Sequence, residues 1–193
     1  MAGGDDSRAF DLDETLRSFL DRVGAAEPGP RGGSVAALTV AMAASLVTVC
    51  ARSSPGSGGM AVEAASLRKR AEALAVVDAE AYAQYLAALE LHDDAAIGVA
   101  LEHAADAPLQ IAETAAETAQ LAAAVAERCD PSLQGDAVAG ALLAEAATRA
   151  AANLVAINLS VGRNDGRVRR AKRLVADATA AAEQAWRRAR ETP

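Results

Sequence analysis

Hydrophobic and polar positions along the chain recur mostly with the period of an α-helix. No stretch shows the sustained period of two, with β-branched residues, that is typical of a strand. Short segments rich in Gly, Pro, Ser or Asp separate the helical stretches. The pattern predicts helices over residues 11–24, 34–52, 61–91, 94–105, 108–128, 136–161 and 167–190. Short connections favour an all-α, antiparallel bundle of about six helices, forming one domain over 1–193 with 1–10 as a flexible terminus.

The second predicted helix has no charged residue or histidine from Gly32 to Ala51. A run of about 18–20 apolar residues is long enough to span a bilayer, so a membrane helix is one interpretation. However, the run is mostly Ala, includes Ser and Thr, and lacks flanking aromatic residues. These features favour a buried central helix and no membrane association.

A glycine loop leads into this helix, with the sequence G-P-R-G-G-S-V-A-A-L over Gly29–Leu38. Ser34 is positioned to cap the helix N-terminus. The first backbone N–H groups of a helix have no partner within it, so they can bind an anionic or polar ligand. The loop therefore predicts a ligand site at the start of this helix.

The composition is rich in alanine and poor in aromatic residues, at 3%. Such a core buries little area per residue, so we expect a homodimer. The formal net charge of −7 argues against general nucleic-acid binding. Cys50 and Cys129 lie in apolar helical settings and are expected to be reduced thiols. The N-terminus is polar and acidic, unlike a signal peptide, so the expected location is the cytoplasm.

One carboxylate interrupts the apolar seam of the third helix. The seam residues recur every three or four positions, and all except Asp78 are apolar or aromatic: Leu67, Ala71, Leu74, Asp78, Ala81 and Tyr85. Desolvation would raise the pKa of this carboxyl toward the range useful for proton transfer. Alternatively, Asp78 reaches a helix N-terminus or an arginine. The pattern leaves both interpretations open.

The remaining polar candidates carry weaker signals. Asn153 and Asn158 lie about 140° apart on one helix, so a single shallow pocket cannot easily use both. Asp136 is expected first of all to be an N-cap. The chain has no Cys, His or Asp cluster with ligand spacing, so no metal is predicted.

Two helices are expected to bury their larger apolar side chains. The first predicted helix has Leu16, Phe19, Leu20 and Val23 on one face, and the last has a stripe ending at Trp186. The other members of that last stripe are Val168, Val175, Thr179 and Ala182.

Taken together, five motifs resemble the formimidoyltetrahydrofolate cyclodeaminase and methenyltetrahydrofolate cyclohydrolase family. The order and spacing match from about residue 15 to residue 161. The five segments are G-P-R-G-G-S-V-A-A-L (Gly29–Leu38), V-D-A-E-A-Y (Val77–Tyr82), A-P-L-Q-I-A-E (Ala107–Glu113), G-D-A-V-A (Gly135–Ala139) and N-L-V-A-I-N-L (Asn153–Leu159).

The resemblance implies a dimeric, all-helical enzyme that acts on one-carbon units carried by tetrahydrofolate. The folate derivative would be the substrate, and no cofactor is implied. By this resemblance Asp78 is the acid/base residue. The positions that would bind substrate or lie at the interface are Gly32, Gly33, Ser34, Tyr82, Asp136, Asn153 and Asn158.

Two departures from the family pattern keep other functions open. Arg31 stands where a third glycine is usual, and its guanidinium would either clamp a substrate carboxylate or block the pocket. After the second helix, A-R-S-S-P-G-S-G-G-M replaces a basic and aromatic segment. The hypotheses are therefore a folate enzyme, an enzyme of the same fold with another small substrate, or a non-catalytic dimeric module.

Overall fold

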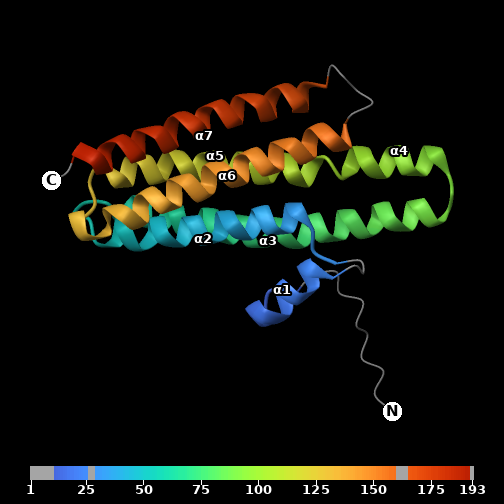
Figure 1. Cartoon of the computed structure of the whole chain (residues 1–193), viewed down its shortest axis with the longest axis horizontal. Helices are drawn as coiled ribbons and strands as arrows, with labels where there is room; N and C mark the ends of the chain where they lie inside the picture. The colour runs from blue at the N-terminus through green and yellow to red at the C-terminus, as the bar shows by residue number, and fades with distance from the viewer. Residues whose placement is uncertain (1–10, 26–28, 160–164, 192–193) are drawn as a thin grey trace, which may run out of the picture.

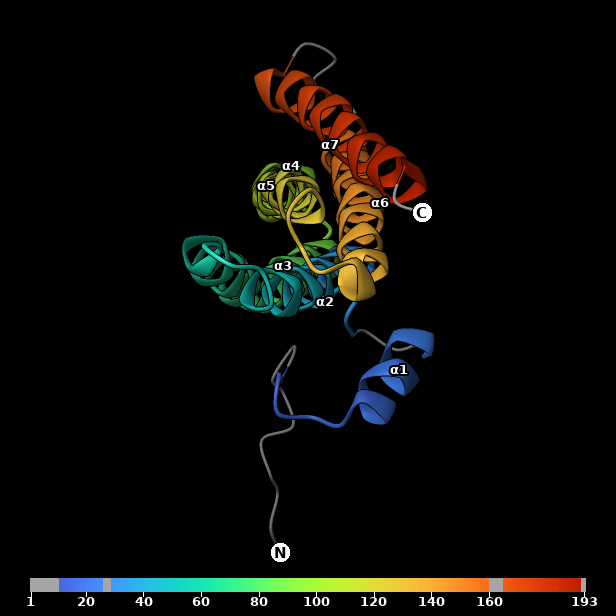
Figure 2. The ribbon, with the colours of Figure 1, turned by 90° about the vertical axis from the view of Figure 1, so that its left-hand side faces the viewer.

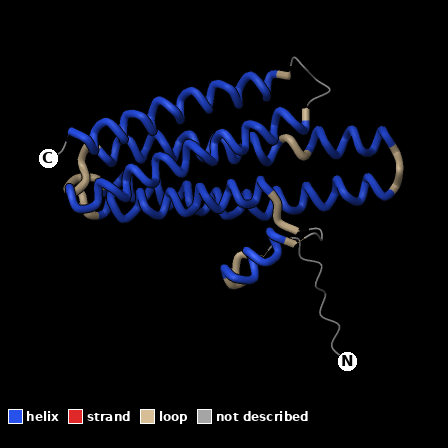
Figure 3. Tube along the Cα trace, in the orientation of Figure 1, coloured by secondary structure: helices blue, strands red, loops and turns tan. Residues whose placement is uncertain are grey.

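The computed structural model describes residues 11–25, 29–159 and 165–191. All regular structure in these ranges is helical, as predicted, and none of it is strand (Figure 3). The elements are α1 (Leu16–Gly24), α2 (Gly32–Arg52), α3 (Gly58–Glu90), α4 (Asp94–His103), α5 (Asp106–Ala126), the 3-10 turn η1 (Pro131–Leu133), α6 (Gln134–Asn158) and α7 (Gly166–Glu191). The predicted flexible terminus, 1–10, and most of the predicted turn at 162–166 lie outside the described residues.

Helices α2 to α7 form an elongated bundle, and α1 lies to one side of it (Figure 1). Helix α2 packs against α3 and α6, and α5 packs against α6 and α7. The view along the bundle shows α2 and α3 in one layer, with α5 and α6 beyond it and α7 outermost (Figure 2). Helix α3 has 33 residues and continues past the start of α2, where α4 packs beside it.

The core of the bundle is built mainly from alanine, and α2 contributes many of its buried residues. Ala37, Val40, Ala44 and Val47 are fully buried, which confirms the prediction of a buried central helix. Close packing requires a glycine on the facing helix. A Cβ at Gly140 of α6 would lie 3.1 Å from Val47 Cγ2 and 3.2 Å from the Ala43 carbonyl oxygen. The small side chains therefore let α2 and α6 approach closely.

Two segments of the bundle are long and apolar enough to cross a bilayer, when only length and composition are considered. They are Gly32–Arg52, with mean hydropathy 2.0, and Pro131–Asn158, with mean hydropathy 1.2. In the first, 56% of the apolar window is buried inside the bundle, as expected of a core helix. The absence of membrane association stays a prediction.

Both predicted N-caps are wrong. Helix α2 begins at Gly32, so Ser34 lies inside its first turn, and Arg31 at the cap position makes no side-chain capping bond. Helix α6 begins at Gln134 because η1 leads directly into it. Asp136 is therefore an exposed first-turn residue, where its charge still favours the positive end of the helix dipole.

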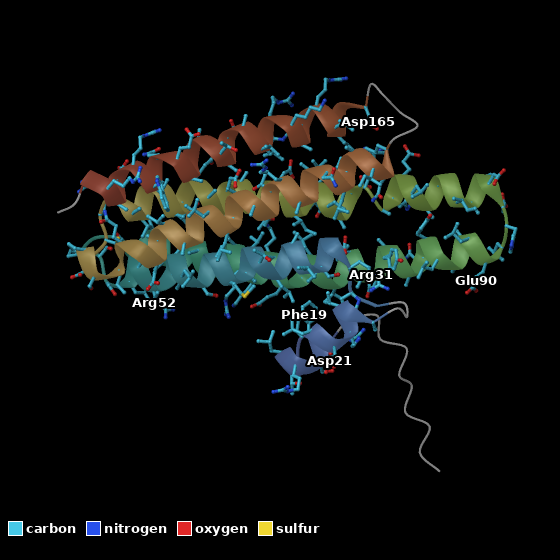
Figure 4. All side chains as sticks on the ribbon, viewed as in Figure 1. Phe19, Asp21, Arg31, Arg52, Glu90 and Asp165 are labelled. Carbon is cyan, nitrogen blue, oxygen red and sulfur yellow. The ribbon has the colours of Figure 1, made fainter. Side chains whose placement is uncertain are left out.

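The apolar face predicted for the first helix is mostly exposed. Phe19 packs into the core at 7% exposure, whereas Leu16 and Leu20 are 71% and 58% exposed. The reason is the position of α1 outside the bundle, where the edge with Phe19 and the partly buried Val23 packs against the core (Figures 1 and 4).

The stripe predicted for the last helix is rotated in the structure. Trp186 is 47% exposed, with the Arg190 guanidinium carbon 5.6 Å from its ring centroid. Small residues make up most of the buried face instead, because they let α7 lie close to α5 and α6. These residues are Ala171, Leu174, Ala178, Ala181, Ala182 and Ala185.

Candidate active site

A cleft of about 250 Å³ opens where α2 begins, α6 ends and α3 continues past both. Helix α4 and the start of α5 complete its wall. Its lining residues are Arg31, Gly32, Gly33, Asp78, Ala81, Tyr82, Tyr85, Leu101, Ala104, Pro108, Leu154, Ile157 and Asn158. The cleft thus gathers residues from four of the five motif segments.

Asp78 of α3 brings its carboxylate to the first turn of α2. The Ser34 hydroxyl lies 3.1 Å from Asp78 Oδ2. Burial raises the pKa of the Asp78 carboxyl above its ordinary value, and hydrogen bonds from the hydroxyl and backbone amide of Ser34 only partly offset this. A carboxyl held in this way is a candidate for exchanging protons with a bound ligand.

Gly33 makes this close approach possible. A Cβ at this position would overlap the Asp78 carboxylate, so any larger residue must displace it. At this position the glycine is required for the space it leaves beside Asp78.

Asp78 also acts as the missing cap of α2. Arg31 provides no capping bond, and the carboxylate from α3 accepts hydrogen bonds from the first turn of α2 instead. A negative charge at a helix N-terminus is favoured by the helix dipole. The sequence leaves open whether Asp78 is a proton-transfer group or a partner of a helix N-terminus. In the structure the Asp78 side chain lines the cleft and also binds the N-terminus of α2.

Ser34 does not line the cleft. Its side chain is fully buried behind Asp78, and its hydroxyl lies 3.1 Å from the carbonyl oxygen of Ala75 as well as near the carboxylate. A substrate in the cleft would meet Ser34 through Asp78. The predicted direct contact with substrate is not supported by this position.

Arg31 stands at the mouth of the cleft and is directed toward α1 (Figure 4). Its Nη1 donates to the carbonyl oxygens of Val23 and Ala25, at 3.5 and 3.3 Å, at the end of α1. The guanidinium thus complements the negative end of the α1 dipole. This role was not among the sequence-based expectations.

Two tyrosines form the aromatic part of the cleft. Tyr82 and Tyr85 of α3 have ring centroids 6.3 Å apart with an interplanar angle of 38°. The family resemblance implies that Tyr82 binds substrate, whereas the sequence pattern places Tyr85 only in the apolar seam. The three-residue spacing on one helix face was the signal that joins them.

Of the two asparagines, only Asn158 lines the cleft. Its Nδ2 donates to the Ala104 carbonyl oxygen at 2.7 Å, which ties the end of α6 to the α4–α5 junction. Asn153 is exposed and outside the lining. Asp136 lies near the other end of α6, remote from the cleft by almost the whole helix.

The α4–α5 wall is fastened from behind by Arg167 of α7. Its guanidinium bonds Asp106 at 2.9 Å, Asp165 at 3.0 Å and the Glu102 carbonyl oxygen at 3.2 Å. Arg167 holds the pKa of the Asp165 carboxyl below its ordinary value. The apolar part of the wall that these contacts support contains Leu101, Ala104 and Pro108.

Two other observations bear on the chemistry. Among residues 11–25, 29–159 and 165–191, no group of three or more His, Cys, Asp or Glu side chains is arranged to hold a metal. A second hollow, the α6–α7 groove, is lined by Leu142, Thr179 and Trp186 together with charged side chains. Its two acids are both paired, Glu145 with Arg149 at 3.3 Å and Glu183 with Arg187 at 3.6 Å.

The protein is thus an all-helical bundle with one desolvated acid, Asp78, in a cleft that two tyrosines line. The sequence profile of the formiminotransferase-cyclodeaminase family matches residues 15–178, and the chain belongs to this family. The expectation from the five motifs is thereby confirmed.

Individual proteins agree with this assignment. A methenyltetrahydrofolate cyclohydrolase of Methylorubrum extorquens is 32% identical over 164 residues, covering 75% of this chain and 79% of its own length. The crystal structure of a formiminotetrahydrofolate cyclodeaminase from Thermotoga maritima superposes with a TM-score of 0.77 at 22% identity, covering 93% and 95% of the two chains. This structural likeness confirms the all-α fold.

Proposed function

We propose that this protein is a methenyltetrahydrofolate cyclohydrolase in which Asp78 transfers the protons. The observation that carries the proposal is the desolvated Asp78 carboxyl facing a cleft of heterocycle size. The relative of 32% identity that is named for this activity supports it.

The reaction adds water across the methenyl bridge. Water attacks the cationic bridging carbon, and Asp78 takes one proton from it. Asp78 then gives this proton to the ring nitrogen as its carbon–nitrogen bond breaks, and the remaining hydroxyl proton leaves to solvent as the formyl group forms. Acid–base assistance of this kind contributes on the order of 10²–10⁴ in rate.

The cleft provides complementary features for such a substrate. Tyr82 and Tyr85 offer aromatic surface to a flat ring, and a negative charge on Asp78 attracts the cationic carbon. Asn158, Arg31 and the N–H groups at the start of α2 are further polar groups at the cleft.

Cyclodeamination is the second candidate, because the same fold occurs in a protein named for it. Here the neighbouring amine nitrogen of the substrate attacks the carbon of the protonated formimino group, and Asp78 moves the proton of that amine to the departing ammonia. Arg31, a departure from the family glycine, instead favours a different small substrate.

Turnover assays separate these candidates. Purified protein should hydrolyse 5,10-methenyltetrahydrofolate faster than it converts 5-formimidoyltetrahydrofolate, and Asp78→Asn should lower kcat at least about 100-fold. Asp136→Asn, at the far end of α6, is the matched control and should keep normal turnover. An Asp78→Asn variant with full activity would remove Asp78 from the mechanism, and absence of folate turnover would favour another substrate.

Two further features belong to this proposal. We expect the enzyme to be a homodimer in the cytoplasm. Support for the dimer comes from exposed apolar side chains, including Leu16 and Leu20 of α1 and Met42 of α2. The free thiols Cys50 and Cys129 suit a reducing compartment.

A further inference from the structure

The Ser34 hydroxyl faces two acceptors with a single proton to donate. Asp78 Oδ2 and the Ala75 carbonyl oxygen both lie 3.1 Å from its oxygen. The side chain is 0% exposed, so it is shielded from bulk water. At any moment the hydroxyl can satisfy only one of these acceptors by donation.

The protonation state of Asp78 determines which of the two acceptors receives the hydrogen bond from the Ser34 hydroxyl. An ionised carboxylate only accepts hydrogen bonds, so the hydroxyl must donate to it, and this charge-assisted bond is the stronger of the two. A protonated carboxyl can donate its own hydrogen to the serine oxygen. The Ser34 proton is then available to the Ala75 carbonyl.

We propose that Ser34 is a positioning residue whose hydroxyl rotates between Ala75 and Asp78 as the carboxyl gains and loses its proton. The inference rests on the proposed function in one respect, which is that Asp78 carries a proton during turnover. In both states the carboxyl keeps a bonded partner, so it need not swing away when its charge changes.

Few other groups around Asp78 can titrate. Within the cleft lining they are Tyr82 and Tyr85 on α3 and the guanidinium of Arg31 before α2. The residues contributed by α4, α5, α6 and the α4–α5 junction carry no titratable side chain: Leu101, Ala104, Pro108, Leu154, Ile157 and Asn158. A chemical-shift change that has the same midpoint pH as the Asp78 carboxyl can therefore be assigned to the ionisation of Asp78.

Carbon-13 NMR of the ligand-free protein tests the switch directly. The Asp78 carboxyl and the Ala75 carbonyl should titrate with the same midpoint, because the hydroxyl joins Ala75 as Asp78 takes up its proton. In Ser34→Ala the Ala75 step should disappear and the Asp78 pKa should rise. Ser45→Ala is the control, since Ser45 donates to the Ala41 carbonyl oxygen on the same helix, at 2.8 Å, away from the cleft.

Kinetics provide a second measurement. Ser34→Ala should lower kcat about tenfold, the equivalent of one charge-assisted hydrogen bond, with KM little changed. Its pH profile should move to higher pH, and Ser34→Thr, which keeps the hydroxyl, should restore the wild-type profile.

An Ala75 carbonyl that does not titrate in the wild-type protein would overturn the switch. So would an Ala75 step that persists unchanged in Ser34→Ala. The wild-type titration needs no variant, so the test stands even if a substitution at this buried position unfolds the chain. Full turnover by Asp78→Asn would contradict the proposed function alone, because the NMR result does not depend on turnover.

Discussion

At the scale of single residues, the absence of a side chain at Gly33 leaves room for the Asp78 carboxylate at the start of α2. The carboxylate occupies the space that a side chain at position 33 would need. From there it reaches both the cleft and the first turn of α2. Loss of this space is therefore expected to affect the reaction and the helix cap together.

Gly33→Ala should displace the Asp78 carboxylate. We expect kcat to fall at least about tenfold and the free energy of unfolding to fall by about 1–3 kcal/mol, as in overpacked interiors. Gly98→Ala on α4 is the control, because a Cβ there meets nothing within 4 Å. That variant should be as stable as wild type or slightly more so. Equal activity of the Gly33→Ala variant and wild type would show that the carboxylate position is unimportant.

The raised pKa of Asp78 predicts a cost to stability at neutral pH. A carboxyl whose pKa is higher in the folded than in the unfolded chain binds protons more readily when folded. Its contribution favours folding below the unfolded pKa and is lost as the pH rises through the folded pKa.

Asp78→Asn should therefore unfold at the same or a higher temperature at pH 7, because the amide still accepts hydrogen bonds from α2. As the pH falls through the folded pKa of Asp78, the stability of the wild-type protein should increase relative to that of the variant. Thermal unfolding of both proteins across this pH range measures the effect. A variant much less stable at pH 7 would mean that the charge itself holds α2 in place.

At the scale of secondary-structure elements, the helices could be predicted from the sequence more closely than their ends. Periodicity identifies the helical stretches, and the charge-free stretch indicates that α2 is a buried helix. Helix starts depend on neighbouring elements: Asp78 caps α2 from another helix, and η1 moves the start of α6 ahead of Asp136. Arg31 was selected for its place beside the glycines, but its bonds to α1 depend on a chain path that the local sequence does not encode.

Arg31→Gln should loosen α1. It removes the positive charge beside the carbonyl oxygens of Val23 and Ala25, and part of the hydrogen bonding that joins α1 to the start of α2. Amide hydrogen exchange in α1 should become about tenfold faster, which corresponds to the loss of roughly one hydrogen bond. Arg52→Gln, at the opposite end of α2, should leave α1 unchanged. Unaltered exchange in the Arg31→Gln variant would show that apolar packing by Phe19 and Val23 is sufficient to hold the helix.

At the scale of the whole molecule, the fold is dominated by small side chains. Alanine lets the helices of the bundle pack closely and leaves larger apolar residues at its surface, among them Leu16, Met42 and Trp186. The sequence could predict this composition but could not say which faces of α1 and α7 are covered. Their orientation is set by where the chain connections place each helix.

Sedimentation equilibrium should give twice the mass of one chain. We expect Met42→Glu to shift the protein toward monomer, because it places a charge at an exposed apolar position of α2. Val62→Glu is the matched control, since Val62 is also exposed but lies on α3. A monomeric wild-type protein, or equal effects of the two substitutions, would contradict the expected interface.

The central claim is that Asp78 acts on a substrate held in the cleft where α2 begins. A crystal structure with bound 5,10-methenyltetrahydrofolate or its formyl product tests this most directly. We predict the one-carbon unit within hydrogen-bond reach of the Asp78 carboxyl, about 2.6–3.2 Å or one water away, with the ring system against Tyr82 and Tyr85. A ligand bound in the α6–α7 groove, or one in the cleft whose reacting carbon points away from Asp78, would contradict it.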